Sequence, residues 1–147
     1  MPEDLNKKLE ECRKKRDEYL AGWQRARADF INYKKDEAER LKEFVKAAHL
    51  DFILKILPIL DNFEAAEKGL KNRQDDKEIK GLLQIKTQLE DFLKKEGVEE
   101  IKTLGEKFDP NFHEAVEGRG DRIVEVVKKG YLLDNKVIRP AQVKLTE

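Results

Sequence analysis

Large side chains return at alternating steps of four and three residues along the first third of the chain. This spacing constrains the fold more than any other feature, and no proline interrupts it before Pro58. It is typical of a long helix that pairs with another helix in a coiled coil. One extra residue between Glu37 and Leu41 resembles a local stutter in the repeat. The positions are Leu5, Leu9, Cys12, Arg16, Tyr19, Trp23, Ala26, Phe30, Tyr33, Glu37, Leu41, Phe44 and Ala48.

A single helix of about fifty residues would be roughly 75 Å long and would leave this apolar stripe in water. The stripe therefore predicts a partner helix, most simply the same helix of a second copy of the chain. We expect such a paired helix over residues 1–50. Arg16, Ala26 and Glu37 are weak core residues and Gly22 disfavours a helix, so we expect the outer half of the pair to be marginally stable.

The apolar surface widens between residues 50 and 70, in the stretch "LDFILKILPILDNFEAAEKGL". A surface that wide needs more than one neighbouring helix. Pro58 has no N–H to donate to the carbonyl of Leu54, so we expect the helix to kink or break there. Asp61 or Asn62 is suited to cap a restarted helix.

A polar link, "KNRQDD", leads to a second amphipathic segment. We expect a helix from about Lys77 to Glu96, with Gly97 ending it. Two antiparallel helices per chain, doubled by a second copy, make a four-helix bundle. Residues 51–97 are therefore the predicted bundle helices.

Residues 98–147 are predicted to form a compact β domain. The stretches "DRIVEVVKKGYLL" and "KVIRPAQVKL" are rich in β-branched residues, and Asp134-Asn135 between them suits a two-residue hairpin turn. Val98 to Ile101 is a candidate for a further strand. Pro140 cannot lie in a central ladder, so we expect an edge or a bulge there. The predicted fold class is α+β, with a long N-terminal coiled-coil helix, a dimeric four-helix bundle and a small C-terminal β domain.

The composition excludes several classes of function. Charged residues make up 42% of the chain and cancel to a formal net charge of zero, whereas a general nucleic-acid binder needs a basic surplus. The chain has no serine, which excludes a serine nucleophile, and its one cysteine, Cys12, excludes an intrachain disulfide. No stretch approaches the roughly 18 apolar residues of a membrane span. We expect a soluble cytoplasmic protein that binds neither nucleic acid nor a membrane and that needs no cofactor.

One stretch, "GEKFDPNFHEAV", has the residue types of an acid–base or metal site, because Asp109, His113 and Glu114 lie within six residues. A zinc site would need further ligands, but His49 is the only other histidine and no cysteine is near. Asp109 is instead a good helix N-cap, with Pro110 at the first helical position. We therefore predict a helical turn or two at "DPNFHEAV" and neither a catalytic nor a metal site.

Several stretches together resemble one family. The chain from about Arg25 to Leu145 resembles GrpE, the nucleotide exchange factor of DnaK-type chaperones. Any one stretch is weak evidence, but their joint order and spacing make the resemblance specific. The stretches are "RARADFINYKKDEAER", "ILPILDNFEAAEKGL", "KKEGVEEI", "GEKFDPNFHEAV" and "KKGYLLDNKVIRPAQV".

This resemblance implies a parallel homodimer with a long paired helix, a central four-helix bundle and a C-terminal β domain. It also implies a protein that is not an enzyme. One β domain of such a dimer inserts into the nucleotide-binding domain of the DnaK-type chaperone and holds its cleft open, so that ADP leaves. The exchange factor acts by binding the open cleft more tightly than the closed one.

The same resemblance assigns partner contacts residue by residue. It places polar and basic contacts on the long helix, a contact loop in "GEKFDPNFHEAV", and apolar contacts on the strands of the β domain. These positions are Asn32, Lys34, Lys35, Phe108, Pro110, Val127 and Leu145.

Five further positions are predicted to matter mainly through structure. Gly81 matches a bundle glycine whose integrity matters to function. Asp109 is the predicted cap of the contact loop, and Gly130, Arg139 and Pro140 match positions that we interpret as structural. The alternative hypothesis, from another class of function, is a coiled-coil scaffold whose β domain tethers an unrelated partner.

Overall fold

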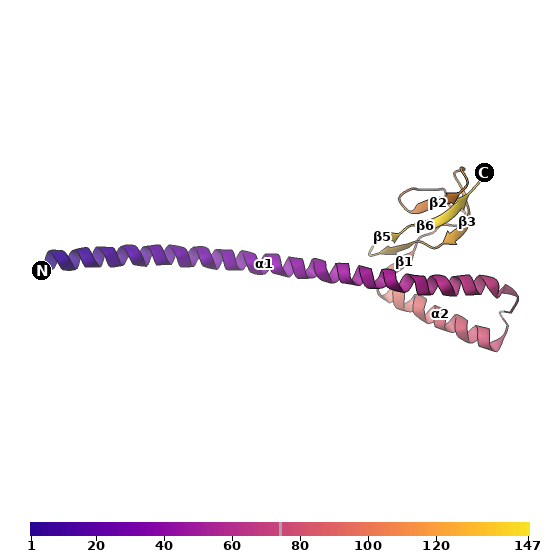
Figure 1. Ribbon diagram of the computed structural model, residues 1–147, viewed down its shortest axis with the longest axis horizontal. Coiled ribbons are helices and arrows are strands. Elements are labelled where there is room, and N and C mark those ends of the chain that lie inside the picture. The colour runs from indigo at the N-terminus through magenta and orange to yellow at the C-terminus, as the bar shows by residue number, and fades with distance from the viewer. Residues whose placement is uncertain (74) are drawn as a thin grey trace. The chain divides into compact units, whose positions relative to one another are not determined.

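The computed structural model describes residues 1–73 and 75–147. Helix α1 runs over Pro2–Gly69, the 3-10 helix η1 over Lys71–Arg73 and helix α2 over Lys77–Lys95. The chain divides into two compact units, residues 1–47 and residues 48–147. Figure 1 labels the elements.

The first unit is wholly helical, as the repeat predicts. Its stripe of large side chains is exposed in the single chain. Trp23 is 56% exposed, Phe30 58% and Tyr33 60%. The long helix is thus confirmed, and the paired helix stays a prediction.

Of the kink or break expected at Pro58, the break is wrong, because α1 continues through Pro58 to Gly69 (Figure 1). A proline inside a helix removes one backbone hydrogen bond and crowds the preceding turn. Here Leu57 and Leu60, on either side of Pro58, are buried, and their packing opposes a break. Asp61 therefore does not cap a restarted helix. Its carboxylate instead accepts hydrogen bonds from Arg139.

Helix α2 is confirmed within one residue of the expected end. It stops at Lys95, and Gly97 follows with φ +88°. A side chain at that backbone conformation would be strained, and a Cβ there would lie 2.6 Å from Oδ1 of Asp134. Glycine therefore lets the chain leave the helix and enter the first strand.

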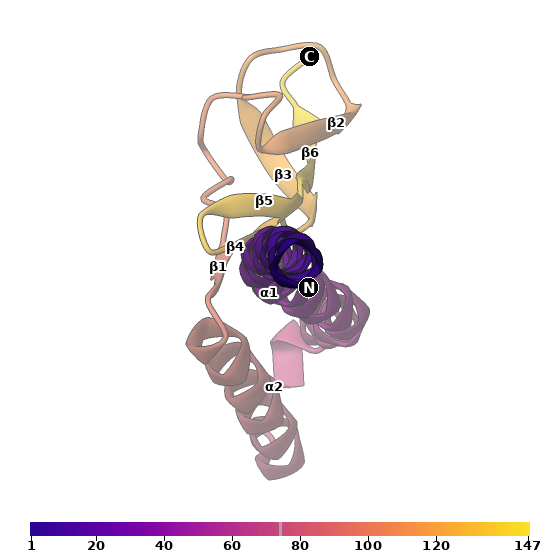
Figure 2. The ribbon, with the colours of Figure 1, turned by 90° about the vertical axis from the view of Figure 1, so that its left-hand side faces the viewer.

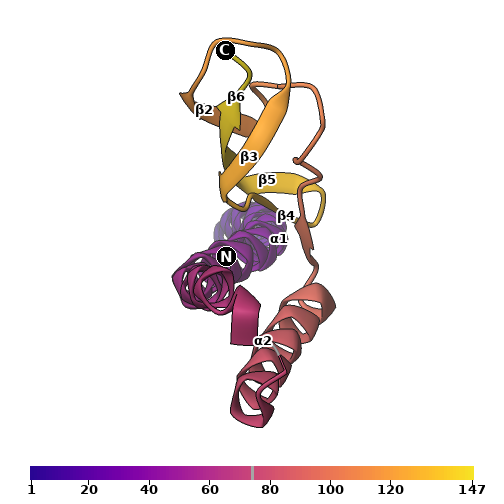
Figure 3. The same ribbon diagram turned by 90° about the vertical axis from the view of Figure 1, so that its right-hand side faces the viewer.

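The β domain contains two three-stranded sheets. The first has the order β1-β4-β5 and is antiparallel, and the second has the order β2-β6-β3, with β2 parallel to β6 and β3 antiparallel to it. In Figures 2 and 3, β1 and β4 lie near the helices and β2 lies farther away. The strands are β1 Val98–Glu100, β2 His113–Glu117, β3 Ile123–Lys128, β4 Tyr131–Leu133, β5 Lys136–Arg139 and β6 Ala141–Leu145.

The predicted hairpin is confirmed as the turn between β4 and β5. Asp134 and Asn135 have φ values of 48° and 67°, as a two-residue turn with a left-handed backbone requires. The strand expected at Val98 to Ile101 is also present, as β1.

Pro140 lies where the chain leaves one sheet for the other. It separates β5 from β6, and because it lacks an N–H it belongs to neither ladder. At Pro140, where an edge or a bulge was expected, the chain passes from the first sheet to the second. Gly130 lies opposite, and a Cβ on it would be 2.4 Å from the backbone nitrogen of Ala141.

Two separate hydrophobic clusters form the core of the second unit. The first joins α1 and α2 to the sheet β1-β4-β5, and the second lies within the sheet β2-β6-β3, with Phe108 and Val126 packed against it. The first consists of Ile53, Leu57, Leu60, Leu93, Val98, Tyr131 and Leu133, and the second of Ile123, Ala141, Val143 and Leu145.

Replacing Gly130 by alanine is expected to destabilise the β domain by about 2 kcal/mol or more, because the new methyl group meets rigid backbone at Ala141. Urea unfolding followed by circular dichroism measures the change. Gly22→Ala is the comparison, because the space around Gly22 is open and its backbone is helical, so the added methyl group should not destabilise the chain. Equal losses from the two variants would contradict a steric role for Gly130.

Candidate functional site

The loop that precedes β2 is built around Asp109. Its carbonyl oxygen accepts hydrogen bonds from the N–H groups of Phe112, at 3.0 Å, and His113, at 2.9 Å. Its Oδ1 accepts one from the N–H of Asn111 at 3.0 Å. Asp109 thus caps a turn, as expected of it.

Of the helical turn or two predicted to follow this cap, one turn forms. A second turn is wrong, because the chain enters β2 at His113. Pairing with the central strand β6 decides the outcome. His113 is opposite Ala141, whose N–H donates to the carbonyl oxygen of Phe112 at 3.0 Å. Local helix signals are weak compared with a strand partner and a shared core.

His113 supports the loop from within the domain. Its ring is only 6% exposed, and Nδ1 accepts a hydrogen bond from the backbone N–H of Asp109 at 3.0 Å. The rings of Phe108 and Phe112 lie 6.1 and 6.3 Å from it, centre to centre. The Asp109 carboxylate is directed to Asn111, so the two residues hold a turn and do not form an acid–base pair.

The predicted apolar contacts differ in exposure. Pro110 is exposed, Val127 is 43% exposed, and Phe108 is half-buried against the second hydrophobic cluster. Leu145 is only 8% exposed and belongs to that cluster. Leu145 would therefore contribute to docking by supporting the surface residues from beneath, and this role stays a prediction.

Val124 is an exposed apolar residue that sequence reasoning missed. If side chains alternated strictly along β3, Val124 and Val127 would lie on different faces of the strand. The pairing of β3 with β6 instead shifts register between Ile123 and Glu125 and again between Val126 and Lys128. Both valines fall at these irregularities and are exposed. The sequence carries no signal for a bulge, so the exposure of both Val124 and Val127 could not be predicted from it.

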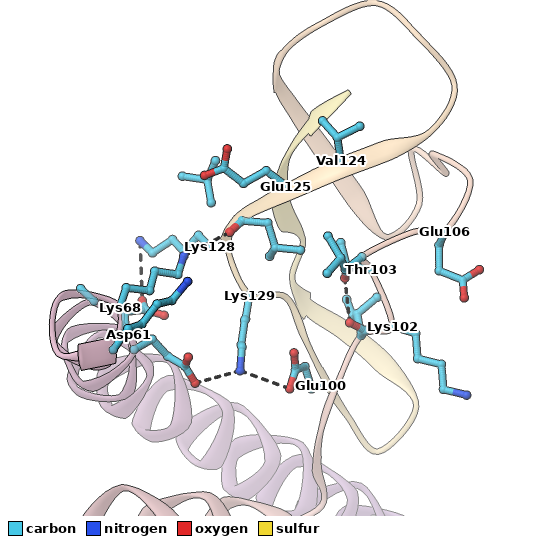
Figure 4. A pocket seen from close by; sticks show the side chains of 17 residues that line it. Asp61, Lys68, Glu100, Lys102, Thr103, Glu106, Val124, Glu125, Lys128 and Lys129 are labelled. Carbon is cyan, nitrogen blue, oxygen red and sulfur yellow. Dashed lines mark hydrogen bonds and ion pairs between the residues drawn. The ribbon is translucent and has the colours of Figure 1, made fainter. Parts of the chain in front are cut away.

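Val124 and Val127 line a groove of about 1080 Å³ between β3, the last turns of α1 and the segment after β1 (Figure 4). Leu104, which is 68% exposed, adds a third apolar side chain. The β side of the groove thus combines these valines with the charged Glu125, Lys128 and Lys129, and further lysines come from α1, η1 and the segment after β1. These further lysines are Lys68, Lys71 and Lys102.

A network of ion pairs closes the end of the groove nearest the helices. The Glu64 carboxylate lies 3.0 Å from Lys86 Nζ of α2 and 2.8 Å from Lys129 Nζ, which follows β3. Lys86 is 9% exposed and also pairs with Glu67 and Glu90. Burial alone would raise the pKa of Glu64, but the hydrogen bonds from the two lysines outweigh it and hold this pKa below its ordinary value.

Asn32, Lys34 and Lys35, the contacts expected on the long helix, are exposed on α1 in the first unit. Lys34 Nζ lies 5.6 Å from the ring centre of Phe30. Gly81 lies in α2, where a Cβ added to it would meet nothing within 4 Å. Val127 and the lysines of the groove lie together in the structure. That the predicted residues contact a partner stays a prediction.

In the part of the chain that the structure describes, no three histidine, cysteine or acidic side chains gather as a metal site would require. Within the same residues, no helix is long and apolar enough to cross a membrane.

The comparisons with known proteins agree on one family. The model of the GrpE family matches residues 1–147. This chain belongs to the GrpE family. The Protein GrpE of Alkaliphilus oremlandii is 36% identical, over 99% of this chain and 81% of its own length. Those of Bacillus subtilis and Methanobrevibacter smithii are 41% and 38% identical, over 84% and 87% of this chain and 70% and 71% of their own lengths.

In this GrpE chain, Glu64→Gln is expected to lower the free energy of unfolding by about 2 kcal/mol at neutral pH, because two charge-assisted hydrogen bonds are lost. The pKa of Glu64 is lowered in the folded state from 4.5. Its stabilisation is therefore complete above that value and disappears as the pH falls through the folded pKa.

Denaturant unfolding at neutral pH and at about pH 3 measures both effects, and the gap between wild type and variant should narrow in acid. Glu114→Gln, on the exposed surface of β2, is the control and should change little at either pH. A gap that stays constant or widens in acid would show that Glu64 is not stabilised as a carboxylate.

Proposed function

We propose that this chain is an adenine-nucleotide exchange factor for a DnaK-type chaperone, and that it is not an enzyme. The observation that carries the proposal is the match to the GrpE family over the whole of residues 1–147. Its β domain binds the nucleotide-binding domain of the chaperone in the form with an open cleft. By linkage, a protein that prefers the open form lowers the affinity of the chaperone for ADP.

The geometry of the β domain supports a docking role. Asp109 and Nδ1 of His113 are occupied with backbone hydrogen bonds, whereas the buried Nε2 of His113 has no hydrogen-bond partner among the described residues. The loop instead presents Pro110 to the surface, and β3 presents Val124 and Val127. Exposed apolar side chains that a rigid framework holds are typical of a protein-binding surface.

The helices support a homodimer, which we propose to be parallel. One side of α1 and α2 packs on the first cluster, while Phe52 and Ile59 of α1 and Ile85 of α2 are about half exposed. Gly81 fits the same proposal. A glycine inside a helix is less favourable than alanine by about 1 kcal/mol, and nothing in this chain fills the space beside it. A neighbouring helix of the second copy would use that space.

Asn32, Lys34 and Lys35 on the long helix supply further polar contacts to the chaperone in this proposal. All three are exposed, so they are available to a partner. The proposed place of action is the cytoplasm, where a lone cysteine such as Cys12 stays reduced.

Release of a fluorescent ADP analogue from a DnaK-type chaperone, followed by stopped flow, tests the proposal. The wild-type protein at micromolar concentration should accelerate release. Val127→Asp should raise the concentration needed for half-maximal acceleration at least about tenfold, because a charge would replace an apolar contact.

Val137→Asp is the matched control, since Val137 is 38% exposed on β5, away from the groove, and should behave as wild type. Absence of acceleration by the wild type, with cognate and related chaperones, would reject the exchange function in favour of a tethering protein. Equal effects of the two substitutions would reject the surface around Val127.

A further inference from the structure

Among the described residues, neither hydrophobic cluster joins the sheet that carries the docking residues to the helices. The first hydrophobic cluster joins α1 and α2 to β1 and β4, whereas the second consists of residues from β3 and β6 alone. In Figures 2 and 3, β2 lies farthest from the helices, and one end of β3 comes near α1. The angle of this sheet to α1 must therefore be set by other contacts.

Polar contacts from one face of α1 fill this role. Asp61, Glu64 and Lys68 are spaced by three and four residues, so they share a face of the helix. Lys68 Nζ donates to the carbonyl oxygen of Val126 in β3 at 3.4 Å, and Lys128 Nζ lies 3.8 Å from Asp61 Oδ2 (Figure 4). These two contacts are long, so they restrain the sheet only weakly.

Short contacts come from Lys129, whose Nζ lies 2.8 Å from Glu64 Oε1, and above all from Arg139. Its Nη1 and Nη2 donate to Asp61 Oδ2 and Oδ1 at 2.7 Å each, and its Nε donates to the carbonyl oxygen of Lys129 at 3.0 Å. The guanidinium also lies 5.2 Å from the ring centre of Tyr131. Both side chains of the ion pair are more than four-fifths buried. A two-pronged pair of this kind fixes orientation as well as distance.

The position of Arg139 in the chain connects this pair to the docking sheet. It is the last residue of β5, and after Pro140 the chain enters β6, the central strand of the sheet β2-β6-β3. The carbonyl that Arg139 binds belongs to Lys129, one residue after β3 ends. One guanidinium thus holds α1, the start of β6 and the end of β3 together.

We propose that Asp61 and Arg139 are positioning residues that lock the sheet β2-β6-β3 at a fixed angle to α1. This inference rests on the proposed exchange function. A docking sheet whose angle to α1 is not fixed would still bind the chaperone. It would rotate relative to α1 instead of forcing the cleft open. Loss of the pair should therefore reduce the maximal rate of ADP release more than it reduces affinity.

The test compares Asp61→Asn with Asp51→Asn. Both remove one carboxylate from α1, but Asp51 pairs with Lys55 on the same helix and Asp61 pairs across to the β domain. Asp61→Glu keeps the charge and should restore most of the wild-type behaviour. Thermal unfolding of each variant gives the temperature below which all are folded, and the other measurements are made there.

The first measurement is the distance between spin labels on cysteines at Ala66 and Glu114, which are exposed on α1 and β2. The chain carries Cys12→Ala, and labelled chains are diluted into unlabelled ones so that the distances lie within one chain. Asp61→Asn should broaden the distance distribution, and Asp51→Asn should leave it as narrow as in the wild type. A narrow distribution in Asp61→Asn would overturn the proposal whatever the exchange assay shows.

The second measurement is ADP release over a range of protein concentrations. Asp61→Asn should lower the maximal rate about tenfold while changing the half-saturating concentration less than about threefold. A broadened distribution with an unchanged maximal rate would overturn the positioning role. Failure of the wild type to accelerate release would reject the exchange function, and the label distances would still decide whether the pair holds the sheet.

Discussion

The burial of Leu57 and Leu60 against the β domain is the interaction on which the second unit depends. Both side chains are at most 2% exposed, and they contact the cluster that contains Tyr131 and Leu133 of β4. Burial of two leucines contributes roughly 3 to 6 kcal/mol, which offsets the roughly 3 kcal/mol that a proline inside a helix costs. The same packing therefore keeps α1 continuous at Pro58 and seats the sheet β1-β4-β5 on the helix.

The sheet that attaches the β domain to the helices is not the sheet that carries the proposed docking residues. The sheet β1-β4-β5 shares its core with the helices, and the sheet β2-β6-β3 has a core of its own that supports the exposed loop and valines. The surface proposed to bind the chaperone can therefore change without loss of the helical core. Its orientation then depends on the polar contacts that cross to α1, of which Arg139 to Asp61 is the shortest and most buried.

Local signals in the sequence predicted the elements that local physics decides. The repeat from Leu5 onward gave the long helix, Gly97 gave the end of α2, and Asp134-Asn135 gave the hairpin. The failures lie where distant residues decide the outcome. The break expected at Pro58 does not occur because packing across the domain opposes it, and no second helical turn follows Asp109 because β2 pairs with β6.

The candidate site shows the same limit. Pro110 and Val127 are exposed, as docking residues should be, but Leu145 is buried in the second cluster. The exposure of Val124 accompanies register shifts in β3 that the residue types do not predict. The bond between Asp61 and Arg139 joins residues 78 positions apart. The sequence marks both as charged and gives no sign that they meet.

Hydrogen exchange of the backbone amides, with and without a nucleotide-free DnaK-type chaperone, tests most directly the central claim that the β domain is the docking element. Bound amides should exchange more slowly in the loop at residues 108–112 and in β3 at residues 124–128. Protection confined to the first unit, residues 1–47, with none in the β domain, would contradict the account.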